Sequence, residues 1–306
     1  MKIVILEKIE MTKVQKERLN SLGEVKYYEN STLEECKERI KDADVVIIDW
    51  IEPNPFLEYM KPNSLLALMS TGYNWIDIKK ARSLGISVVN IPGYAREAVV
   101  EHLFGLALSI FKGIAFGDRV IREGSWKKGQ IQGLELKNKT LGIIGLGRNG
   151  QRMAEIGQKG FGMNIIAYDS SPKNLLGIKE VALRKLLKES DLIAITCNLN
   201  PASENLIGEE EFKLMKPTAV IVSATWGVID LSALFNALKN KKIFGAGLDL
   251  ELAERPKLPN EFPKLNNLIL TPHTAYRTKE SQIRRVDICF NNIESFLSDE
   301  PQNIVN

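Results

Sequence analysis

The sequence predicts an α/β protein built from two doubly wound parallel sheets. Short runs of Val, Ile and Leu alternate with amphipathic stretches along almost the whole chain, and this alternation is typical of parallel sheets covered by helices on both faces. The length of 306 residues corresponds to about two domains of roughly 150 residues each. With 44% hydrophobic and 26% charged residues, the chain can bury a sizeable core.

The first third of the chain predicts one of the two sheets. Short apolar runs bounded by turn residues predict strands at 2–6, 45–49, 66–70 and 86–90. Two amphipathic stretches between them predict helices over 12–22 and 32–40. Gly23 ends the first helix, and Thr32 and Glu35 have the spacing of a capping box at the start of the second.

The middle of the chain predicts a long buried helix followed by the second sheet. Residues 96–117 contain no Pro and are apolar on more than one face, so we expect a single helix that is buried on most sides. After a polar stretch, six strands are expected at 141–144, 164–168, 192–196, 219–223, 243–248 and 268–271. A last helix over 279–297 places one apolar face along Ile283, Val286, Phe290, Ile293 and Leu297.

Composition excludes several classes of protein. The 41 Lys and Arg nearly balance the 38 Asp and Glu, without dense basic blocks, so neither a nucleic-acid partner nor an anionic membrane surface is expected. No stretch approaches the roughly 20 apolar residues of a membrane span. Cys36, Cys197 and Cys289 are scattered, and the chain has only two histidines, His102 and His273. We therefore expect reduced thiols, no metal site and a cytoplasmic protein.

A glycine-rich motif predicts a dinucleotide site. Gly145, Gly147 and Gly150 directly follow the apolar run 140–144 and precede a helical stretch. This spacing supplies a tight turn, a close approach to a pyrophosphate and close helix packing, with the phosphates at the helix N-terminus. The hexapeptide alone is weak evidence, but Asp169 ends the next predicted strand nineteen residues after Gly150, where the fingerprint requires an acidic residue.

Asp169 also predicts which dinucleotide binds. A carboxylate at this position accepts hydrogen bonds from both ribose hydroxyls of NAD and repels the 2′-phosphate of NADP. The following residues, 170–172, include no basic side chain, which supports NAD. The alternative is that Asp169 only caps the end of a strand.

Four segments of the sequence resemble one known family. The run LKNKTLGIIGLGRNGQRMAEIGQKGFGMNIIAYDSSP resembles the cofactor domain of the D-isomer-specific 2-hydroxyacid dehydrogenases. The run STGYNWIDIKKARSLGISVVNIPGYAREAVVEHLF resembles the hydroxypyruvate reductase, glycerate dehydrogenase and phosphoglycerate dehydrogenase branch. FGAGLDLELAERP and LILTPHTAYRTKES are similar to two further family segments. The four segments follow in the family's order over nearly the whole chain.

The resemblance implies an architecture and an activity. A Rossmann NAD-binding domain, residues 96–278, is expected to be inserted into a flavodoxin-like substrate domain formed by residues 1–95 and 279–306. The implied activity is NAD-dependent hydride transfer between NAD(H) and a small 2-hydroxy or 2-keto acid. A homodimer is also implied, and the apolar stretch 99–110 is compatible with it.

The resemblance assigns the proton-handling residues. His273 matches the family's general acid/base, and Glu254, five residues after Asp249, matches the Glu that is hydrogen-bonded to it. An imidazolium is a suitable proton donor near neutral pH, and an adjacent carboxylate orients it and favours its charged form. Asp249 matches the Asp near the nicotinamide ribose. His102 lies on the long predicted helix, where packing or an interface role is expected.

Other residues are implied around the substrate and the cofactor. The loop that receives the substrate carboxylate is matched by Gly72, Tyr73 and Asn74. The cofactor site is expected to include Gly145, Gly147, Arg148, Asn149, Gly150, Asp169, Cys197, Thr225 and Asp249.

One departure from the family concerns its catalytic arginine, which holds the substrate carboxylate and polarises the carbonyl. In the matching segment MKPTAVIVSATWGVID, counting forward places Trp226 at that position, and counting back from Asp230 places Thr225 there. Neither is an arginine, and Trp offers one neutral donor where a guanidinium offers a charged fork. Removing one such stabiliser costs about 3 kcal/mol, or at least about a hundredfold in rate.

Two interpretations of this departure remain open. In the first, Arg277 or Arg96 supplies the missing charge, and the chain is a dehydrogenase whose anion clamp has been reassigned. In the second, the pocket is altered, so that either the substrate lacks a carboxylate or the chain is an NAD(H)-binding regulatory or scaffold protein with weak or no turnover. A homologue that binds no dinucleotide is disfavoured by the intact glycines and Asp169.

Overall fold

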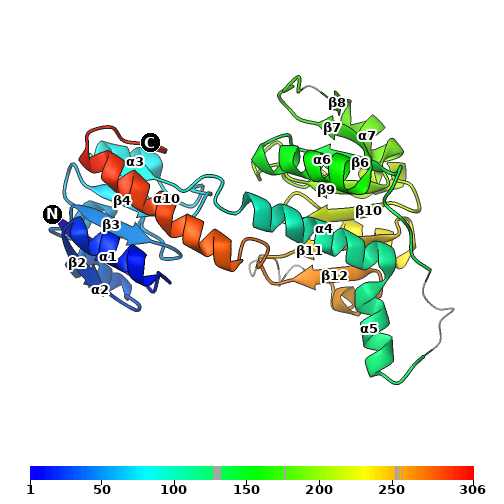
Figure 1. Ribbon diagram of the computed structural model, residues 1–306, viewed down its shortest axis with the longest axis horizontal. Helices are drawn as coiled ribbons and strands as arrows, with labels where there is room; N and C mark the ends of the chain where they lie inside the picture. Colours follow the sequence, from blue (N-terminus) through cyan, green and yellow to red (C-terminus); the bar gives the residue numbers. More distant parts are fainter. Residues whose placement is uncertain (127–131, 176, 252–253, 255, 257) are drawn as a thin grey trace. The chain divides into compact units, whose positions relative to one another are not determined.

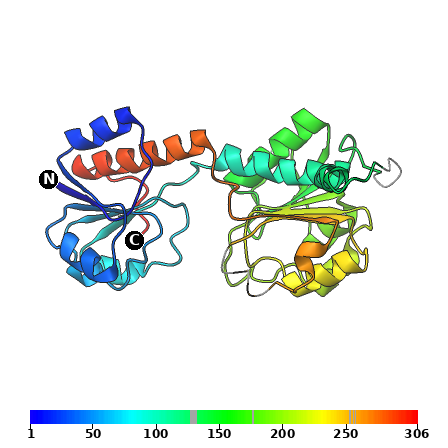
Figure 2. The same cartoon turned by 90° about the horizontal axis from the view of Figure 1, so that it is seen from below.

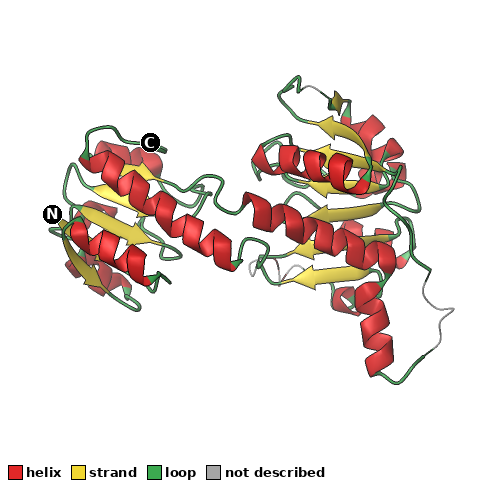
Figure 3. Cartoon of the chain, viewed as in Figure 1, coloured by secondary structure: helices red, strands yellow, loops and turns green. Residues whose placement is uncertain are grey.

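Figure 1 shows the computed structural model, which describes residues 1–126, 132–175, 177–251, 254, 256 and 258–306. The chain forms two compact units: Met1–Ala95 with Arg277–Asn306, and Arg96–Tyr276. The second unit is thus inserted into the sequence of the first, and its C-terminal limit lies two residues before the predicted one. In each unit, helices cover both faces of a parallel sheet (Figures 2 and 3).

The sheet of the first unit has five parallel strands in the order β2-β1-β3-β4-β5, the order of flavodoxin-like folds. The strands are β1 (Lys2–Ile5), β2 (Glu24–Tyr27), β3 (Val45–Ile48), β4 (Leu65–Leu68) and β5 (Ser87–Val89). The sequence did not predict β2. This edge strand, EVKY, has no buried residue, so it lacks the apolar pattern that marks the other four strands.

The helices of the first unit include the three that the sequence predicts and one further helix, α3. They are α1 (Lys13–Ser21), α2 (Leu33–Arg39), α3 (Ile78–Ser83) and α10 (Lys279–Leu297), with a short 3-10 helix at Leu57–Tyr59. The capping box of Thr32 and Glu35 is confirmed, and Thr12 and Gln15 form another at α1. The apolar face predicted for α10 is partly wrong, because Ile283 and Leu297 are exposed. Polar residues take their place on the buried face, where Arg285 pairs with Asp49.

The long helix predicted over 96–117 is two helices in the structure. α4 (Arg96–Lys112) and α5 (Ile114–Arg122) meet at Gly113, whose φ of 65° ends the first helix, and their axes differ by 61°. Eight residues of α4 are buried, whereas α5 buries none. No single helix in the described part of the chain is long and apolar enough to cross a membrane; α4 and α5 meet that test only as a bent pair.

The sheet of the second unit has seven parallel strands in the order β12-β11-β10-β9-β6-β7-β8. Apart from one added edge strand, this is the Rossmann order, with the change of direction between β6 and β9. The strands are β6 (Thr140–Ile144), β7 (Asn164–Tyr168), β8 (Lys179–Glu180), β9 (Leu192–Ile195), β10 (Val220–Ser223), β11 (Gly245–Asp249) and β12 (Leu268–Thr271). Only β8, a polar edge strand of two residues, was missed by the sequence.

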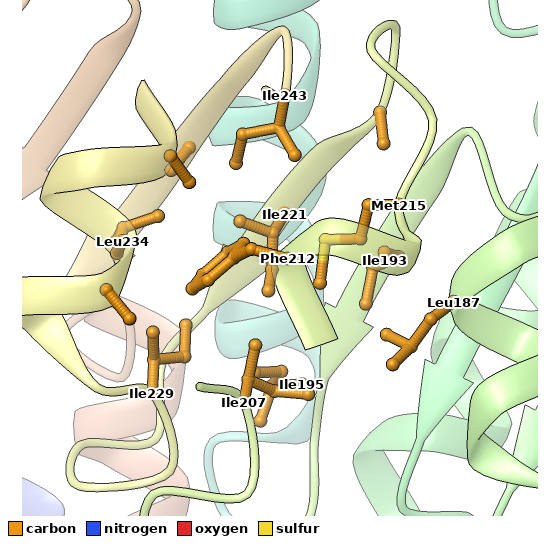
Figure 4. Close-up of a cluster of buried hydrophobic side chains, with 14 of the residues drawn as sticks. Leu187, Ile193, Ile195, Ile207, Phe212, Met215, Ile221, Ile229, Leu234 and Ile243 are labelled. Carbon is orange, nitrogen blue, oxygen red and sulfur yellow. The ribbon is translucent and has the colours of Figure 1, made fainter. Parts of the chain in front are cut away.

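Helices pack on both faces of this second sheet. They are α4, α6 (Arg148–Phe161), α7 (Leu183–Glu189), α8 (Glu209–Leu214) and α9 (Leu231–Lys239), with a 3-10 helix at Phe262–Lys264. Figure 4 shows one of the two apolar clusters that join them to the sheet, with Ile221, Phe212 and Ile229 facing one another. Val228 and Ile229 are buried in this cluster, so the loop from β10 to α9 is anchored just before α9.

Candidate functional site

The glycine-rich loop has the geometry that a pyrophosphate requires. Gly145 has a φ of +98°, and a Cβ there would lie 2.5 Å from the backbone nitrogen of Cys197. A Cβ on Gly150 would lie 2.0 Å from the carbonyl oxygen of Gly145. Gly147, in contrast, faces open space, and no side chain caps α6, so its first N–H groups remain available to an anion. These residues fit the phosphates of a dinucleotide.

Asp169 lies where the ribose hydroxyls of such a dinucleotide are expected. It follows β7 directly; its Oδ2 accepts a hydrogen bond from the Leu146 amide (2.8 Å) and its Oδ1 from the Ser171 amide (2.9 Å). A carboxylate accepts about four hydrogen bonds, so Asp169 retains capacity for hydroxyl groups. Lys173 Nζ lies 3.8 Å from Oδ1, just beyond the stretch 170–172 that lacks basic residues.

The other predicted cofactor residues lie around the same loop. Arg148 is exposed and Asn149 is half-buried at the start of α6. Cys197 packs its backbone against Gly145, and burial raises the pKa of its thiol to about 11.

His273 follows β12 in a turn with a left-handed backbone, with a φ of 51°. Its Nδ1 forms an ion pair with a carboxylate oxygen of Glu251. The ring of Tyr276 meets the imidazole edge-on, with 5.4 Å between the ring centroids. The imidazole is therefore oriented by a carboxylate on one nitrogen and by an aromatic ring.

Asp249, the last residue of β11, clamps the turn that carries His273. Its side chain is buried and accepts hydrogen bonds from the Thr271 hydroxyl (2.6 Å) and from the amides of Thr274 (2.9 Å) and Ala275 (2.8 Å). These donors lie on both sides of His273 in the sequence. Their combined hydrogen bonds hold a backbone conformation that few residues other than glycine adopt.

Glu254, predicted as the partner of His273, is buried and holds backbone groups. Its Oε1 accepts from the Gly227 amide (3.1 Å), and its Oε2 accepts from the Glu251 amide (3.3 Å). It therefore links the loop after β10 to the turn that carries Glu251. Sequence reasoning missed Glu251, although its place two residues after Asp249, beyond the carboxyl end of β11, was a usable signal.

The loop at the position of the family's arginine is closed by its own residues. The hydroxyl of Ser223 accepts from the Thr225 amide (3.0 Å) and donates to the Thr225 carbonyl (2.8 Å). Trp226 is 39% exposed. Thr225 and Glu254 line a cavity of about 10 Å³. That volume holds about one water molecule.

The two candidate replacements for the arginine differ in their surroundings. Arg96 Nε lies 2.9 Å from Glu97 Oε1, and the same carboxylate group also pairs with Arg152 at 2.8 Å. Arg277 is exposed at the boundary of the two units, and within the described ranges it takes part in no ion pair. Of the two guanidinium groups, that of Arg277 is the less engaged.

In the first unit, the loop after β4 carries the residues predicted to receive a carboxylate. Gly72, Tyr73 and Asn74 are exposed. The Gly72 carbonyl accepts hydrogen bonds from the hydroxyl of Ser70 (2.7 Å) and the indole nitrogen of Trp75 (3.2 Å). The loop is thus fixed by its own side chains.

His102 does more than pack. Its Nε2 lies 2.9 Å from the Thr271 hydroxyl oxygen and 3.9 Å from Asp249 Oδ1, and its side chain is 23% exposed. This polar contact joins α4 to the residue that begins the His273 turn.

Comparison with known proteins places the chain in a family. Residues 104–275 match the NAD-binding domain of the D-isomer specific 2-hydroxyacid dehydrogenases. A glyoxylate reductase of Thermococcus litoralis is 38% identical over 283 residues, which cover 88% of this chain and 85% of that protein. A hydroxypyruvate reductase of Blautia hydrogenotrophica is 34% identical over 302 residues, 94% of each chain.

Solved structures agree with these matches. An acyclic imino acid reductase in complex with NADPH and D-Arg superposes with a TM-score of 0.91 at 30% identity, covering 100% of both chains. A D-lactate dehydrogenase of Aquifex aeolicus, complexed with NAD and lactic acid, has a TM-score of 0.82 at 28% identity, covering 98% of this chain and 96% of that one. The chain therefore belongs to the D-isomer specific 2-hydroxyacid dehydrogenase family and is an oxidoreductase that uses NAD.

Proposed function

We propose that the protein interconverts a small 2-keto acid and its 2-hydroxy acid, with His273 as the general acid/base. The observation that carries this proposal is the imidazole of His273, which is held on a clamped turn with Glu251 at Nδ1. When bound, NADH supplies the hydride that adds to the carbonyl carbon. His273 donates the Nε2 proton to the carbonyl oxygen, and the products are the hydroxy acid and NAD⁺; oxidation reverses both transfers.

The two glutamates have different roles in this proposal. Glu251 balances the charge of the imidazolium and fixes the ring, so that Nε2 is the nitrogen that exchanges the proton. Glu254 acts on His273 through Glu251. It accepts hydrogen bonds from the amide of Glu251 and from the amide of Gly227, next to Trp226, and so holds the two segments together.

The substrate carboxylate is assigned to the loop of Gly72, Tyr73 and Asn74 and to an arginine outside the family position. Arg277 is the better candidate, because Glu97 engages Arg96. Arg277 is four residues from His273, so their Cα atoms are at most about 14 Å apart even in an extended chain. The names of the relatives, glyoxylate and hydroxypyruvate reductases, favour a keto acid of two or three carbons.

The cofactor side of the proposal uses the residues around the glycine-rich loop. Gly145, Gly147 and Gly150 with the amides of Arg148 and Asn149 would hold the pyrophosphate. The ribose hydroxyls are assigned to Asp169, and the nicotinamide end is assigned to Cys197, Thr225 and Asp249.

We also propose a homodimer in the cytoplasm. α5 buries none of its residues, and Ile114 and Ile121 on it are 58% and 41% exposed, which supports contact with a second copy. The free thiols of Cys36, Cys197 and Cys289 support a reducing compartment. Light scattering of the purified chain tests the dimer, with Ile114→Asp as the variant expected to give monomers.

The test of the activity is NADH oxidation with a panel of small 2-keto acids and simple carbonyls, each with and without ammonium. We expect turnover with at least one 2-keto acid, and its loss in His273→Ala while NADH still binds. Turnover only with ammonium would move the substrate class to imino acids. NADH binding without turnover on any compound would instead support a regulatory or scaffold protein.

A further inference from the structure

The contact between His102 and Thr271 has a defined direction. Thr271 has one hydroxyl proton, and at 2.6 Å from the carboxylate of Asp249 that proton must point to Oδ1, because an ionised carboxylate only accepts. The carbonyl oxygen of Leu248, at 3.5 Å, is too distant to compete. The Thr271 oxygen can then only accept from His102 Nε2 at 2.9 Å. His102 must therefore carry a proton on Nε2.

This direction joins α4 to the turn of His273 through a single chain of hydrogen bonds. His102 Nε2–H donates to Thr271, Thr271 donates to Asp249, and Asp249 accepts the amides of Thr274 and Ala275. α4 is a fixed support for this chain, because seven of its residues are buried in an apolar cluster of the second unit. His273 lies in the sequence between Thr271 and Thr274, and Asp249 holds both of these residues.

We propose that His102 is a positioning residue for His273. By donating to Thr271, it holds the hydroxyl of Thr271 on Asp249 and keeps Asp249 oriented toward the amides beyond His273. Without this donor, the Thr271 oxygen loses its hydrogen-bond donor in a half-buried site, and the clamp on the turn loosens. The effect on turnover rests on the proposed function; the hydrogen-bond direction and the effect on the His273 ring do not.

The kinetic test compares two substitutions at His102. His102→Gln keeps a donor near the position of Nε2, whereas His102→Leu keeps similar volume without any donor. We expect kcat to fall about tenfold or more in His102→Leu and less than about threefold in His102→Gln. Glu101→Gln, an exposed neighbour on α4, is the matched control and should keep the wild-type kcat. Equal losses in the Leu and Gln variants would overturn the proposal.

A second pair of variants at Thr271 keeps the proposal testable if His102→Leu does not fold. Thr271→Ser retains the hydroxyl, and Thr271→Val replaces it with a methyl group of similar shape. We expect Thr271→Ser to retain most of kcat and Thr271→Val to lose about tenfold or more. Retained kcat in Thr271→Val would show that the hydroxyl link is not used.

Nuclear magnetic resonance tests the inference without turnover. The chain has only two histidines, so selective ¹⁵N-histidine labelling yields two imidazoles, which His273→Ala assigns. We expect the Nε2–H form of His102 in the wild type, and His273 signals that move in His102→Leu but not in His102→Gln. A neutral Nδ1–H His102, or His273 signals unmoved in His102→Leu, would defeat the inference. A wild-type protein without turnover would defeat only the proposed function.

Discussion

Two loops of the second unit, on either side of β11, hold their exposed side chains in different ways. The turn after β12 carries His273 and is tied to the surrounding strands through Asp249. The loop after β10, where the resemblance implies an arginine, carries Trp226 at an exposed position. Substituting a residue of a buried hydrogen-bond network loosens its neighbours. An exposed side chain on an anchored loop can be substituted without this effect.

The backbone of the loop after β10 does not depend on an arginine for its conformation. The backbone of the loop after β10 is held by Ser223 at its start and by Val228 and Ile229 in the core at its end. None of these contacts involves a guanidinium. A substitution at Trp226 is therefore expected to change the charge of the loop and to leave its backbone in place.

The largest effect is expected at the turn after β12. His273→Ala removes the proton donor, and we expect kcat to fall about 10²- to 10⁴-fold. Calorimetric titration with NADH should still show binding, because the glycine-rich loop and Asp169, which are assigned to the phosphates and the ribose, are unchanged. A variant with near wild-type kcat would remove His273 from the chemistry.

A large effect of opposite sign is expected at the loop after β10. Trp226→Arg places a guanidinium at one of the two positions that the resemblance assigns to the family's arginine, and we expect kcat/KM for the preferred 2-keto acid to rise about tenfold or more. Thr225→Arg tests the other alignment of the segment in the same assay. If both variants lower kcat/KM, the pocket has been rebuilt around the tryptophan and a charge can no longer be restored there.

Substitutions of Glu251 and Glu254 should have different effects on kcat. Glu251→Gln removes the charge at His273 Nδ1 and should lower kcat about tenfold, since losing about 1.4 kcal/mol of interaction with the imidazolium corresponds to that factor. Glu254→Gln keeps an acceptor for the amides of Gly227 and Glu251. It should therefore lower the melting temperature and leave the pH dependence of kcat close to that of the wild type. A larger loss of kcat in Glu254→Gln would return the direct role to Glu254.

A smaller effect is expected at the cofactor end. Asp169→Asn removes a charged acceptor for the ribose hydroxyls, and we expect about tenfold weaker NADH binding. The same change removes the repulsion of a 2′-phosphate, and Lys173 lies beside it, so NADPH should bind more tightly. Fluorescence titration of both dinucleotides gives the ratio; a wild-type protein that prefers NADPH would contradict the role of Asp169.

The smallest effect is expected at Cys197. Gly145 packs against the backbone of this residue, so Cys197→Ser should change the Kd for NADH by no more than about twofold. Because burial raises the pKa of the thiol to about 11, about one thiol in 10⁴ is ionised at pH 7. Alkylation by iodoacetamide should therefore be slow at pH 7 and accelerate as the pH rises towards 11. Rapid alkylation at pH 7 would show that the thiol is not buried.

The sequence predicted the buried strands well and the polar edges poorly. Strands such as β3 and β10 are continuous apolar runs, which burial on both sheet faces requires, whereas β2 and β8 are polar and became strands only through their neighbours. The break at Gly113 was missed because apolar residues continue beyond it and only the positive φ ends the helix.

The candidate site was predicted unevenly for a similar reason. Asp169 and the glycines stand in a motif whose spacing predicts their place, and His273 was assigned from the resemblance to the family. The contact of Glu251 with His273 depends on the conformation of a turn, and that of His102 depends on how α4 packs beside β12. Neither relation is encoded in local spacing, so only the folded chain shows them.

The central claim is that His273 donates the proton, whereas Arg277, outside the position of the family's arginine, binds the substrate carboxylate. The most direct test is the ratio of kcat/KM for a 2-keto acid to that for its amide, which differs in charge but hardly in shape, in the wild type, in Arg277→Ala and in Arg96→Ala as the matched control. We predict a ratio of about 100 or more in the wild type and in Arg96→Ala, and a fall of at least about tenfold in Arg277→Ala. An unchanged ratio in Arg277→Ala would contradict the account.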